Sequence, residues 1–228
     1  MAQLKPIPEH EASGEAARVY EEIRETLGIV FVPNFFKTLA NSPTALRATW
    51  EAYRNVSWRG NVPTVLKEMM FVAISAARKC HYCETAHLAF CKLLGSDSET
   101  RRSLVENLDA ILPRRSADVV KFAVKAALNP AEMDSADYQG LRDHGISDAE
   151  IAEILAMTAF SRYPAPAASL WQPPVERHQV RNEGGQRIEV RMERIETLAR
   201  ISIRDDGPGI IVELPLPAVR DMAEPGDA

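Results

Sequence analysis

Helical periodicity runs through most of this chain and restricts its fold more than any other feature. In the stretch EAARVYEEIRETLG, apolar residues recur three or four positions apart and end at Gly28, a common signal for a helix C-terminus. Ser42-Pro43 is typical of a helix start, with serine as the cap and proline in the first turn. The letters SDAE at 147–150 have the form of a capping box. We therefore expect an all-α domain over residues 1–170.

The sequence pattern changes after this domain. The stretch YPAPAASLWQPPVE contains four prolines and predicts a linker over 171–185. RIEVRMER, ARISIRDD and IIVELPLP then alternate apolar and polar residues, which is the period of a β-strand. We expect a small β-strand appendage over 186–217 and a disordered tail over 218–228. The apolar face of such a sheet needs a partner, either the helical domain or the same sheet of another subunit.

Composition excludes several classes of partner. The chain has 46% hydrophobic and 26% charged residues and a net charge of -5, as expected of a globular protein. It has no basic stripe for nucleic acid, no apolar run of the roughly 18 residues that cross a membrane, and no apolar signal core at its N-terminus. We expect a cytoplasmic protein with neither nucleic acid nor membrane as a partner. In that reducing compartment, a close cysteine pair is more often catalytic or metal-binding than structural.

All three cysteines fall within the stretch KCHYCETAHLAFC. Cys80, Cys83, His87 and Cys91 have the chemistry of a zinc ligand set. On one helix, however, residues 83, 87 and 91 lie in a row on the same face, and three ligands in a row cannot surround a tetrahedral ion. Cys91 has apolar neighbours on both sides and is expected to be a small buried hydrophobic residue.

Thiol chemistry accounts for more of these residues. If a helix starts near Cys80, both Cys80 and Cys83 lie in its first turn, where free N–H groups and the helix dipole stabilise a thiolate. His87 follows Cys83 by four residues, so the imidazole lies one turn away and can accept the thiol proton.

Glu68 is the fourth candidate, because it lies in the strongly apolar stretch VPTVLKEMMFVAISAARK, whose helix we expect to be mostly buried. If the chain breaks at about Arg78–Cys80 and folds back as two antiparallel helices, Glu68 lies level with His87. A carboxylate among apolar residues needs such a partner. The alternative is a solvated residue in the first helical turn after Pro63, and spacing alone leaves both interpretations open.

The spacing Glu68-x11-Cys80-x2-Cys83-x3-His87 resembles the active-site motif of the AhpD-like alkylhydroperoxidases, within the carboxymuconolactone decarboxylase superfamily. The stretches VPNFFKTLANSPTALRATWEAY and LRDHGISDAEIAEILAMTAF also resemble the peroxidase-related branch. The resemblance implies an all-α fold, homo-oligomers (trimers or hexamers), and reduction of a hydroperoxide by the cysteine pair. It implies that Cys83 is the peroxidatic thiol, Cys80 its resolving partner, and Glu68 with His87 the proton relay. A dithiol, thioredoxin-like or lipoyl reductant would restore the thiols, and no metal or other cofactor is implied.

Two features depart from that family. Tyr82 stands where the best-studied AhpD type has a histidine directly before its second cysteine. The stretch SRYPAPAASL contains two prolines, so the last helix must kink or stop early. A non-catalytic oligomeric scaffold or redox sensor is the alternative to an enzyme, ahead of a lactone decarboxylase-type enzyme, which needs no cysteine pair.

Other residues receive weaker interpretations. The letters DDGPGI resemble the nucleotide box of a histidine-kinase-type ATPase domain, with Asp205 or Asp206 as the adenine-reading carboxylate, but most of that fold is missing between them and IVELPLP. The alternative is a β-meander in which these letters form a turn. Trp50, Tyr53 and Trp58 lie near one helical stripe and are expected in the core or an interface rather than in a substrate box. Phe35 and Phe36 suit packing or the lining of a substrate channel.

Overall fold

The computed structural model describes residues 4–164 and, further along the chain, residues 179–181, 187–195, 198–204 and 210–215. The chain divides into two compact units, one carrying the helices and one carrying the strands. Each unit is described by itself below. The predicted domain boundaries at residues 170, 185 and 217 stay predictions.

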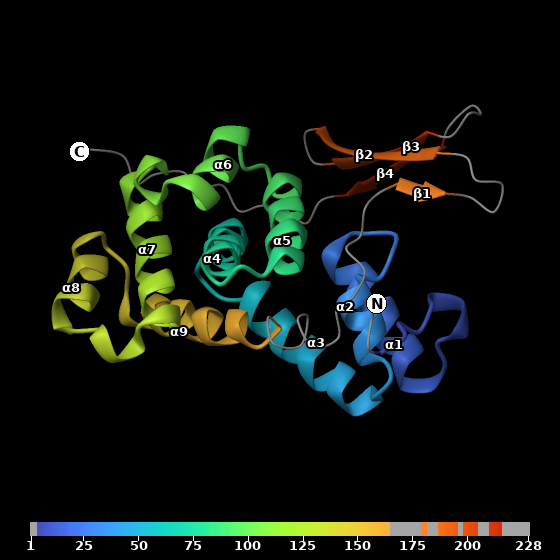
Figure 1. Ribbon diagram of the computed structural model, residues 1–228, viewed down its shortest axis with the longest axis horizontal. Coiled ribbons are helices and arrows are strands. Elements are labelled where there is room, and N and C mark those ends of the chain that lie inside the picture. The colour runs from blue at the N-terminus through green and yellow to red at the C-terminus, as the bar shows by residue number, and fades with distance from the viewer. Residues whose placement is uncertain (1–3, 165–178, 182–186, 196–197, 205–209, 216–228) are drawn as a thin grey trace. The chain divides into compact units, whose positions relative to one another are not determined.

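Within residues 4–164 the chain forms nine α-helices and three short 3-10 helices (Figure 1). In chain order these are η1 (Glu9–Glu11), α1 (Gly14–Leu27), α2 (Asn34–Leu39), α3 (Pro43–Ser57), α4 (Thr64–Ala77), α5 (His81–Leu93), α6 (Ser98–Glu106), η2 (Leu108–Ala110), α7 (Arg114–Leu128), η3 (Pro130–Glu132), α8 (Ser135–Asp143) and α9 (Asp148–Arg162). The all-α interpretation of this part is confirmed. None of the described helices is both long enough and apolar enough to cross a bilayer.

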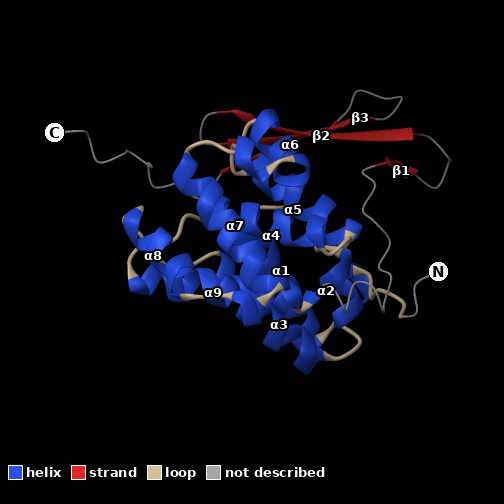
Figure 2. Cartoon of the chain, turned by 60° about the vertical axis from the view of Figure 1, so that its left-hand side comes forward, coloured by secondary structure: helices blue, strands red, loops and turns tan. Residues whose placement is uncertain are grey.

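Helix α4 forms the centre of the helical unit, because α3, α5, α6, α7 and α9 all contact it (Figure 2). Its side chains from Leu66 to Ser75 are all buried; Met70, Phe71, Val72 and Ile74 are 0% exposed. The prediction of a buried helix here is confirmed. A helix covered on all sides has no solvent face on which a charge can rest, so each charged residue in it needs a partner in the protein.

Several helix ends follow the predicted signals. The Ser42 side chain accepts a hydrogen bond from the backbone N–H of Ala45 at the start of α3, and Ser147 with Glu150 forms the predicted capping box of α9. Helix α9 ends at Arg162, beside the prolines at which the helix was predicted to kink or to stop early. The stretch SDSETRRSLVENLDAIL is not one helix, because Asn107 is extended and separates α6 from η2.

A sharp turn separates α4 from α5, at the predicted place. Lys79 has a φ of 58°, in the left-handed region that a side chain seldom adopts. The backbone N–H of Cys80 donates to the carbonyl of Ser75 at 2.9 Å, which closes the end of α4. Cys80 then becomes the N-terminal cap residue of α5. The two helices pack against each other, and Glu68 of α4 meets His87 of α5, as the hairpin prediction required.

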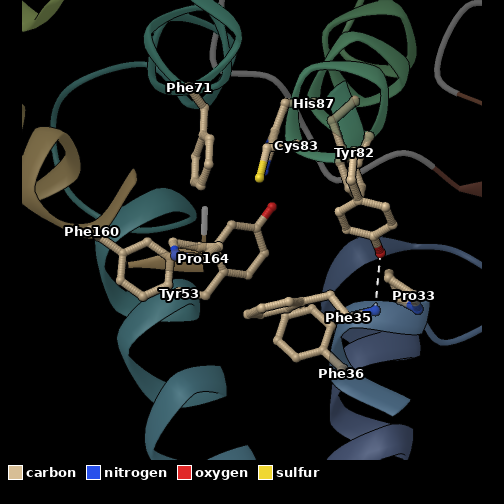
Figure 3. A pocket seen from close by; sticks show the side chains of 12 residues that line it. Pro33, Phe35, Phe36, Tyr53, Phe71, Tyr82, Cys83, His87, Phe160 and Pro164 are labelled. Carbon is tan, nitrogen blue, oxygen red and sulfur yellow. Dashed lines mark hydrogen bonds between the residues drawn. The ribbon is translucent and has the colours of Figure 1, made fainter. Parts of the chain in front are cut away.

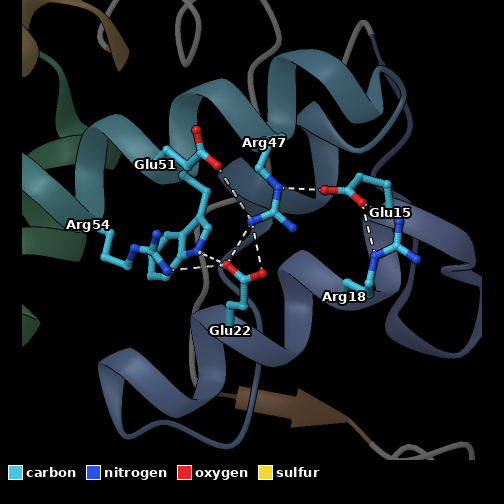
Figure 4. Close-up of polar contacts among 7 residues, drawn as sticks. Glu15, Arg18, Glu22, Arg47, Glu51 and Arg54 are labelled. Atoms are coloured by element: carbon cyan, nitrogen blue, oxygen red, sulfur yellow. Dashed lines mark hydrogen bonds and ion pairs between the residues drawn. The ribbon is translucent and has the colours of Figure 1, made fainter.

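A group of charged side chains joins α1 to α3 (Figure 4). The Arg47 guanidinium on α3 donates to Glu15 at 2.5 Å and to both carboxylate oxygens of Glu22 at 2.9 and 2.8 Å. Glu22 also accepts a hydrogen bond from the Trp50 indole at 3.0 Å. Hydrogen bonds and the nearby guanidiniums lower the pKa of Glu22. We call these residues the Arg47 network; they connect α3 to α1.

The second unit contains a four-stranded antiparallel sheet in the order β1 (Gln179–Arg181), β2 (Arg187–Ile195), β3 (Leu198–Arg204) and β4 (Ile210–Pro215). In its register Val190 pairs with Ile203, and Ile201 pairs with Val212. Strand β1 falls within 171–185, the span predicted as a linker. Asp205, Asp206 and the tail 218–228 lie outside the described residues, so the nucleotide box and the disordered tail stay predictions.

Candidate active site

Glu68 lies on α4 in the interior of the helical unit and is 0% exposed. Its carboxylate oxygen Oε2 lies 2.5 Å from Nδ1 of His87 on α5, and its Oε1 accepts a hydrogen bond of 3.1 Å from the hydroxyl of Tyr53 on α3. The interpretation of Glu68 as a solvated residue is therefore wrong. The chain folds back between α4 and α5 and brings Glu68 and His87 together, as the hairpin interpretation required. Two donors compensate for burying this carboxylate.

The imidazole of His87 is fixed on two sides. Its ring stacks on that of Phe71, with centroids 3.5 Å apart and an interplanar angle of 13°. Its Nδ1 faces the Glu68 carboxylate, so Nδ1 carries the hydrogen when Glu68 is ionised, and Nε2 then keeps its lone pair. A histidine held in this tautomer can act as a base.

The two cysteines at the start of α5 lie in contact. The Sγ atoms of Cys80 and Cys83 are 2.6 Å apart and joined by a hydrogen bond, and both residues are buried. The Cys83 thiol, helped by the Cys83 backbone N–H, lowers the pKa of Cys80 to about 6, although burial acts in the opposite direction. The same hydrogen bond, together with burial, raises the pKa of Cys83. The negative charge of the reduced pair therefore rests on Cys80.

A pocket opens beside these groups and encloses about 470 Å³ of empty space, measured out to its open mouth (Figure 3). Aromatic rings from α2, α3, α4, α5 and α9 dominate its wall. The complete lining is Pro33, Phe35, Phe36, Tyr53, Phe71, Tyr82, Cys83, Ala86, His87, Phe90, Phe160 and Pro164. Cys83 reaches the pocket, whereas Cys80 is not part of its lining.

The pocket includes residues that sequence reasoning assigned otherwise. Tyr53 was expected in the core or an interface; it is buried, but it also lines the pocket and hydrogen-bonds to Glu68. Phe35 and Phe36, for which two roles were open, line it. Phe160 was not singled out. Its ring packs on that of Tyr53 with centroids 5.9 Å apart, across a sequence separation that no local pattern bridges.

Tyr82, between the two cysteines, contacts a different helix from the relay residues. Its hydroxyl accepts a hydrogen bond of 3.0 Å from the backbone N–H of Phe35 (Figure 3). Tyr82, which stands where the resembled family has a histidine, thus links the cysteine segment to the start of α2.

Cys91 is 0% exposed, as a small buried hydrophobic residue would be. Burial, with the charge of Glu68, raises the pKa of its thiol. Within the part of the chain that the structure describes, no group of three or more histidines, cysteines and acidic residues is placed to hold a metal ion.

The chain is similar to known proteins in sequence and in fold. Residues 43–109 match the model of the carboxymuconolactone decarboxylase family. A crystal structure of an alkylhydroperoxidase AhpD core, a peroxidase-related protein of Ralstonia eutropha JMP134, is 29% identical with a TM-score of 0.67 and covers 76% of this chain and 95% of that one. The fold of the helical part of the chain is AhpD-like.

Two further proteins are similar to this chain. A peroxidase-related protein of Silicibacter sp. TM1040 is 28% identical with a TM-score of 0.67, covering 78% of this chain and 96% of that one. An alkyl hydroperoxide reductase of Mycobacterium tuberculosis is 31% identical over 84 residues, which are 37% of this chain. The match spans only 24% of the length of that curated relative.

Proposed function

We propose that this chain is a thiol-dependent reductase of organic hydroperoxides. The observation that carries the proposal is the position of Cys83. Its sulfur lies at the wall of an aromatic-lined pocket, with a second thiol 2.6 Å away and the His87–Glu68 pair beside it. An apolar pocket favours a hydroperoxide with a hydrocarbon body over hydrogen peroxide, because burying the apolar surface of the ligand contributes to binding.

The first step oxidises Cys83, the sulfur that reaches the pocket. Cys83 gives up its proton to Nε2 of His87 or to the Cys80 thiolate. Its sulfur attacks the terminal peroxide oxygen, the O–O bond breaks, and the leaving alkoxide takes that proton and departs as the alcohol. Cys83 is then a sulfenic acid. The Glu68 carboxylate stabilises the positive charge that His87 carries while it holds the proton.

The second step forms a disulfide. The Cys80 thiolate attacks the sulfenic sulfur of Cys83, the S–O bond breaks, and the hydroxyl leaves as water with a proton that His87 has taken up from the solvent, to which Cys80 released its own proton on ionising. The net reaction converts one hydroperoxide and two thiols into one alcohol, one water and one disulfide. An external dithiol, thioredoxin-like or lipoyl group then reduces the disulfide by thiol exchange. Cys80 thus acts as the resolving thiol, and its low pKa of about 6 keeps it ionised for this attack.

Thiol counting tests this proposal. The reduced protein is titrated with cumene hydroperoxide, and free thiols are counted in the wild type, Cys80→Ser, Cys83→Ser and, as a control, Cys91→Ala. We expect the wild type and the control to lose two thiols, Cys80→Ser to consume peroxide, and Cys83→Ser to consume none. Unreactive wild-type thiols would contradict the proposal. If the thiols are oxidised once and added dithiol does not produce continuous consumption of hydroperoxide, the redox-sensor alternative is favoured.

The resemblance to AhpD-like proteins also supports a homo-oligomer, a trimer or a hexamer. Light scattering of the purified chain measures this directly. A monomer at micromolar concentration would contradict it.

A further inference from the structure

Tyr53 contacts both the pocket and the proton relay. It lies on α3, is 4% exposed, and packs its ring on Phe160 at the wall of the pocket. Its hydroxyl points toward the end of the pocket where Cys83 and His87 lie (Figure 3). That hydroxyl donates to Glu68 Oε1 at 3.1 Å, while His87 Nδ1 faces the other oxygen of the same carboxylate.

The tautomer of His87 depends on the charge of Glu68. An ionised Glu68 can only accept hydrogen bonds, so Nδ1 carries the hydrogen and Nε2 is free to accept a proton. A protonated Glu68 would instead donate to Nδ1. The hydrogen of the neutral ring would then sit on Nε2, which could no longer act as a base. A buried carboxylate that loses one of two donors binds a proton more readily, because the remaining charge is less well compensated.

We infer that Tyr53 is a positioning residue of the relay: its hydroxyl keeps Glu68 as the acceptor of the His87 Nδ1 hydrogen, so that Nε2 can take the proton of Cys83. The inference rests on the proposed function for its catalytic meaning. It does not require Tyr53 to exchange a proton itself. Replacing its hydroxyl should therefore change the pH at which the relay works more than the binding of substrate.

The surroundings suit a permanent donor. Burial, reinforced by the charge of Glu68, raises the pKa of Tyr53 well above its ordinary value, so the phenol keeps its hydrogen at every working pH. The titratable groups that interact with Glu68 are Tyr53 on α3 and His87 and Cys91 on α5. The pKa of Cys91 is also raised, so this thiol stays neutral. Loss of the Tyr53 hydroxyl is thus expected to act through Glu68 and His87.

The substitution Tyr53→Phe tests this, because it keeps the ring that lines the pocket and removes only the donor. We expect the acid limb of the pH profile of kcat/KM for cumene hydroperoxide to move to higher pH by about one unit. KM near pH 8 should stay within about twofold of the wild type. Tyr20→Phe is the matched control, since it removes another buried hydroxyl, which donates to the Ile7 carbonyl at 2.9 Å outside the site. Superimposable profiles for Tyr53→Phe and the wild type would overturn the inference.

A second measurement needs neither folding of the variant nor turnover. Nitrogen NMR of the side chain of His87 in the reduced wild-type protein near neutral pH reports which ring nitrogen carries the hydrogen. We expect hydrogen on Nδ1, and on Nε2 if the inference is wrong. If the wild type consumes no hydroperoxide, the proposed function fails, while this tautomer still decides whether Glu68 accepts the Nδ1 hydrogen, which the role inferred for Tyr53 requires.

Discussion

Helix α4 buries two opposite charges at neighbouring positions, and the structure treats them differently. Lys67 is 1% exposed and Glu68 is 0% exposed, so both lie in the interior of the helical unit. Lys67 faces the loop between α3 and α4, where its ammonium donates to the Arg59 carbonyl at 2.5 Å and pairs with Glu153 on α9 at 3.0 Å. Glu68 faces the pocket, where its partners are Tyr53 and His87.

The partners of the two charges differ in kind. Glu153 also accepts hydrogen bonds from the backbone N–H groups of Asn61 and Val62, at 2.8 to 3.0 Å. Most partners of the Lys67–Glu153 pair are therefore backbone groups that never lose or gain a proton. The partners of Glu68 include an imidazole, which does. A buried charge thus indicates catalysis only when its neighbours can exchange protons; otherwise it indicates a fixed connection between elements.

The largest effect on activity should come from Glu68→Gln. The amide has nearly the same shape but no charge, so it cannot stabilise protonated His87. We expect kcat/KM for cumene hydroperoxide to fall by about 10³-fold, within the range for loss of general acid–base catalysis, with a small change in Tm. Stopped-flow peroxide consumption and thermal unfolding measure the two quantities. Activity within tenfold of the wild type would show that Glu68 only supports the fold.

The second effect should appear in stability instead. Glu153→Gln leaves the buried ammonium of Lys67 without a charged partner, which costs about 3 kcal/mol of the free energy of unfolding. The activity of the molecules that remain folded should be unchanged, because neither residue contacts the pocket. Urea unfolding and peroxide turnover on the same sample test both parts.

The double variant Lys67→Met with Glu153→Gln is the matched control. It removes both charges, so no buried charge is left alone, and part of the lost stability should return. A double variant less stable than Glu153→Gln would contradict this account of the pair. So would a loss of turnover in Glu153→Gln without any loss of stability.

The contact between Glu68 and His87 could be predicted from the sequence, because it depends on local features of the chain. The break at Arg78–Cys80 and the helical spacing place Glu68 level with His87, because helix rise and turn position are both readable along the chain. The partners of Glu68 on α3 and of Lys67 on α9 could not be predicted from the sequence. Tyr53 and Glu153 meet α4 through the packing of α3 and α9, and no repeat or spacing records how those helices cross.

The distribution of charge between the cysteines could not be predicted either. Spacing indicated that the first turn of α5 stabilises both thiolates. The two sulfurs share one hydrogen bond, however, and their pKa values therefore shift in opposite directions: that of Cys80 is lowered and that of Cys83 is raised. Strand β1 was missed because its three residues are too few to show a period of two. The peroxidatic role of Cys83 and the resolving role of Cys80 stay predictions.

Cys80 combines both kinds of partner, which gives the third prediction. The Cys83 thiol can exchange its proton, whereas the Cys83 backbone N–H cannot. We expect thiolate absorbance at 240 nm in the Cys91→Ala background to rise with a midpoint near pH 6, the lowered pKa of Cys80. Cys83→Ala removes the thiol but keeps the N–H, so the midpoint should rise toward the ordinary value of about 8.5 without reaching it. An unchanged midpoint would mean that the backbone donor alone stabilises the thiolate.

The smallest effect should follow from Arg47→Gln. The Arg47 network also consists of ion pairs, but its side chains reach water; Arg47 is 24% exposed and Glu22 is 31% exposed. When Arg47 is removed, Glu22 still accepts from the Trp50 indole and lies 3.5 Å from Arg54, so no charge is left without a partner. We expect a loss below about 1 kcal/mol in urea unfolding, which shrinks further in high salt. A loss as large as that of Glu153→Gln would show that the number of charged partners, and not burial, decides the cost of breaking such a pair.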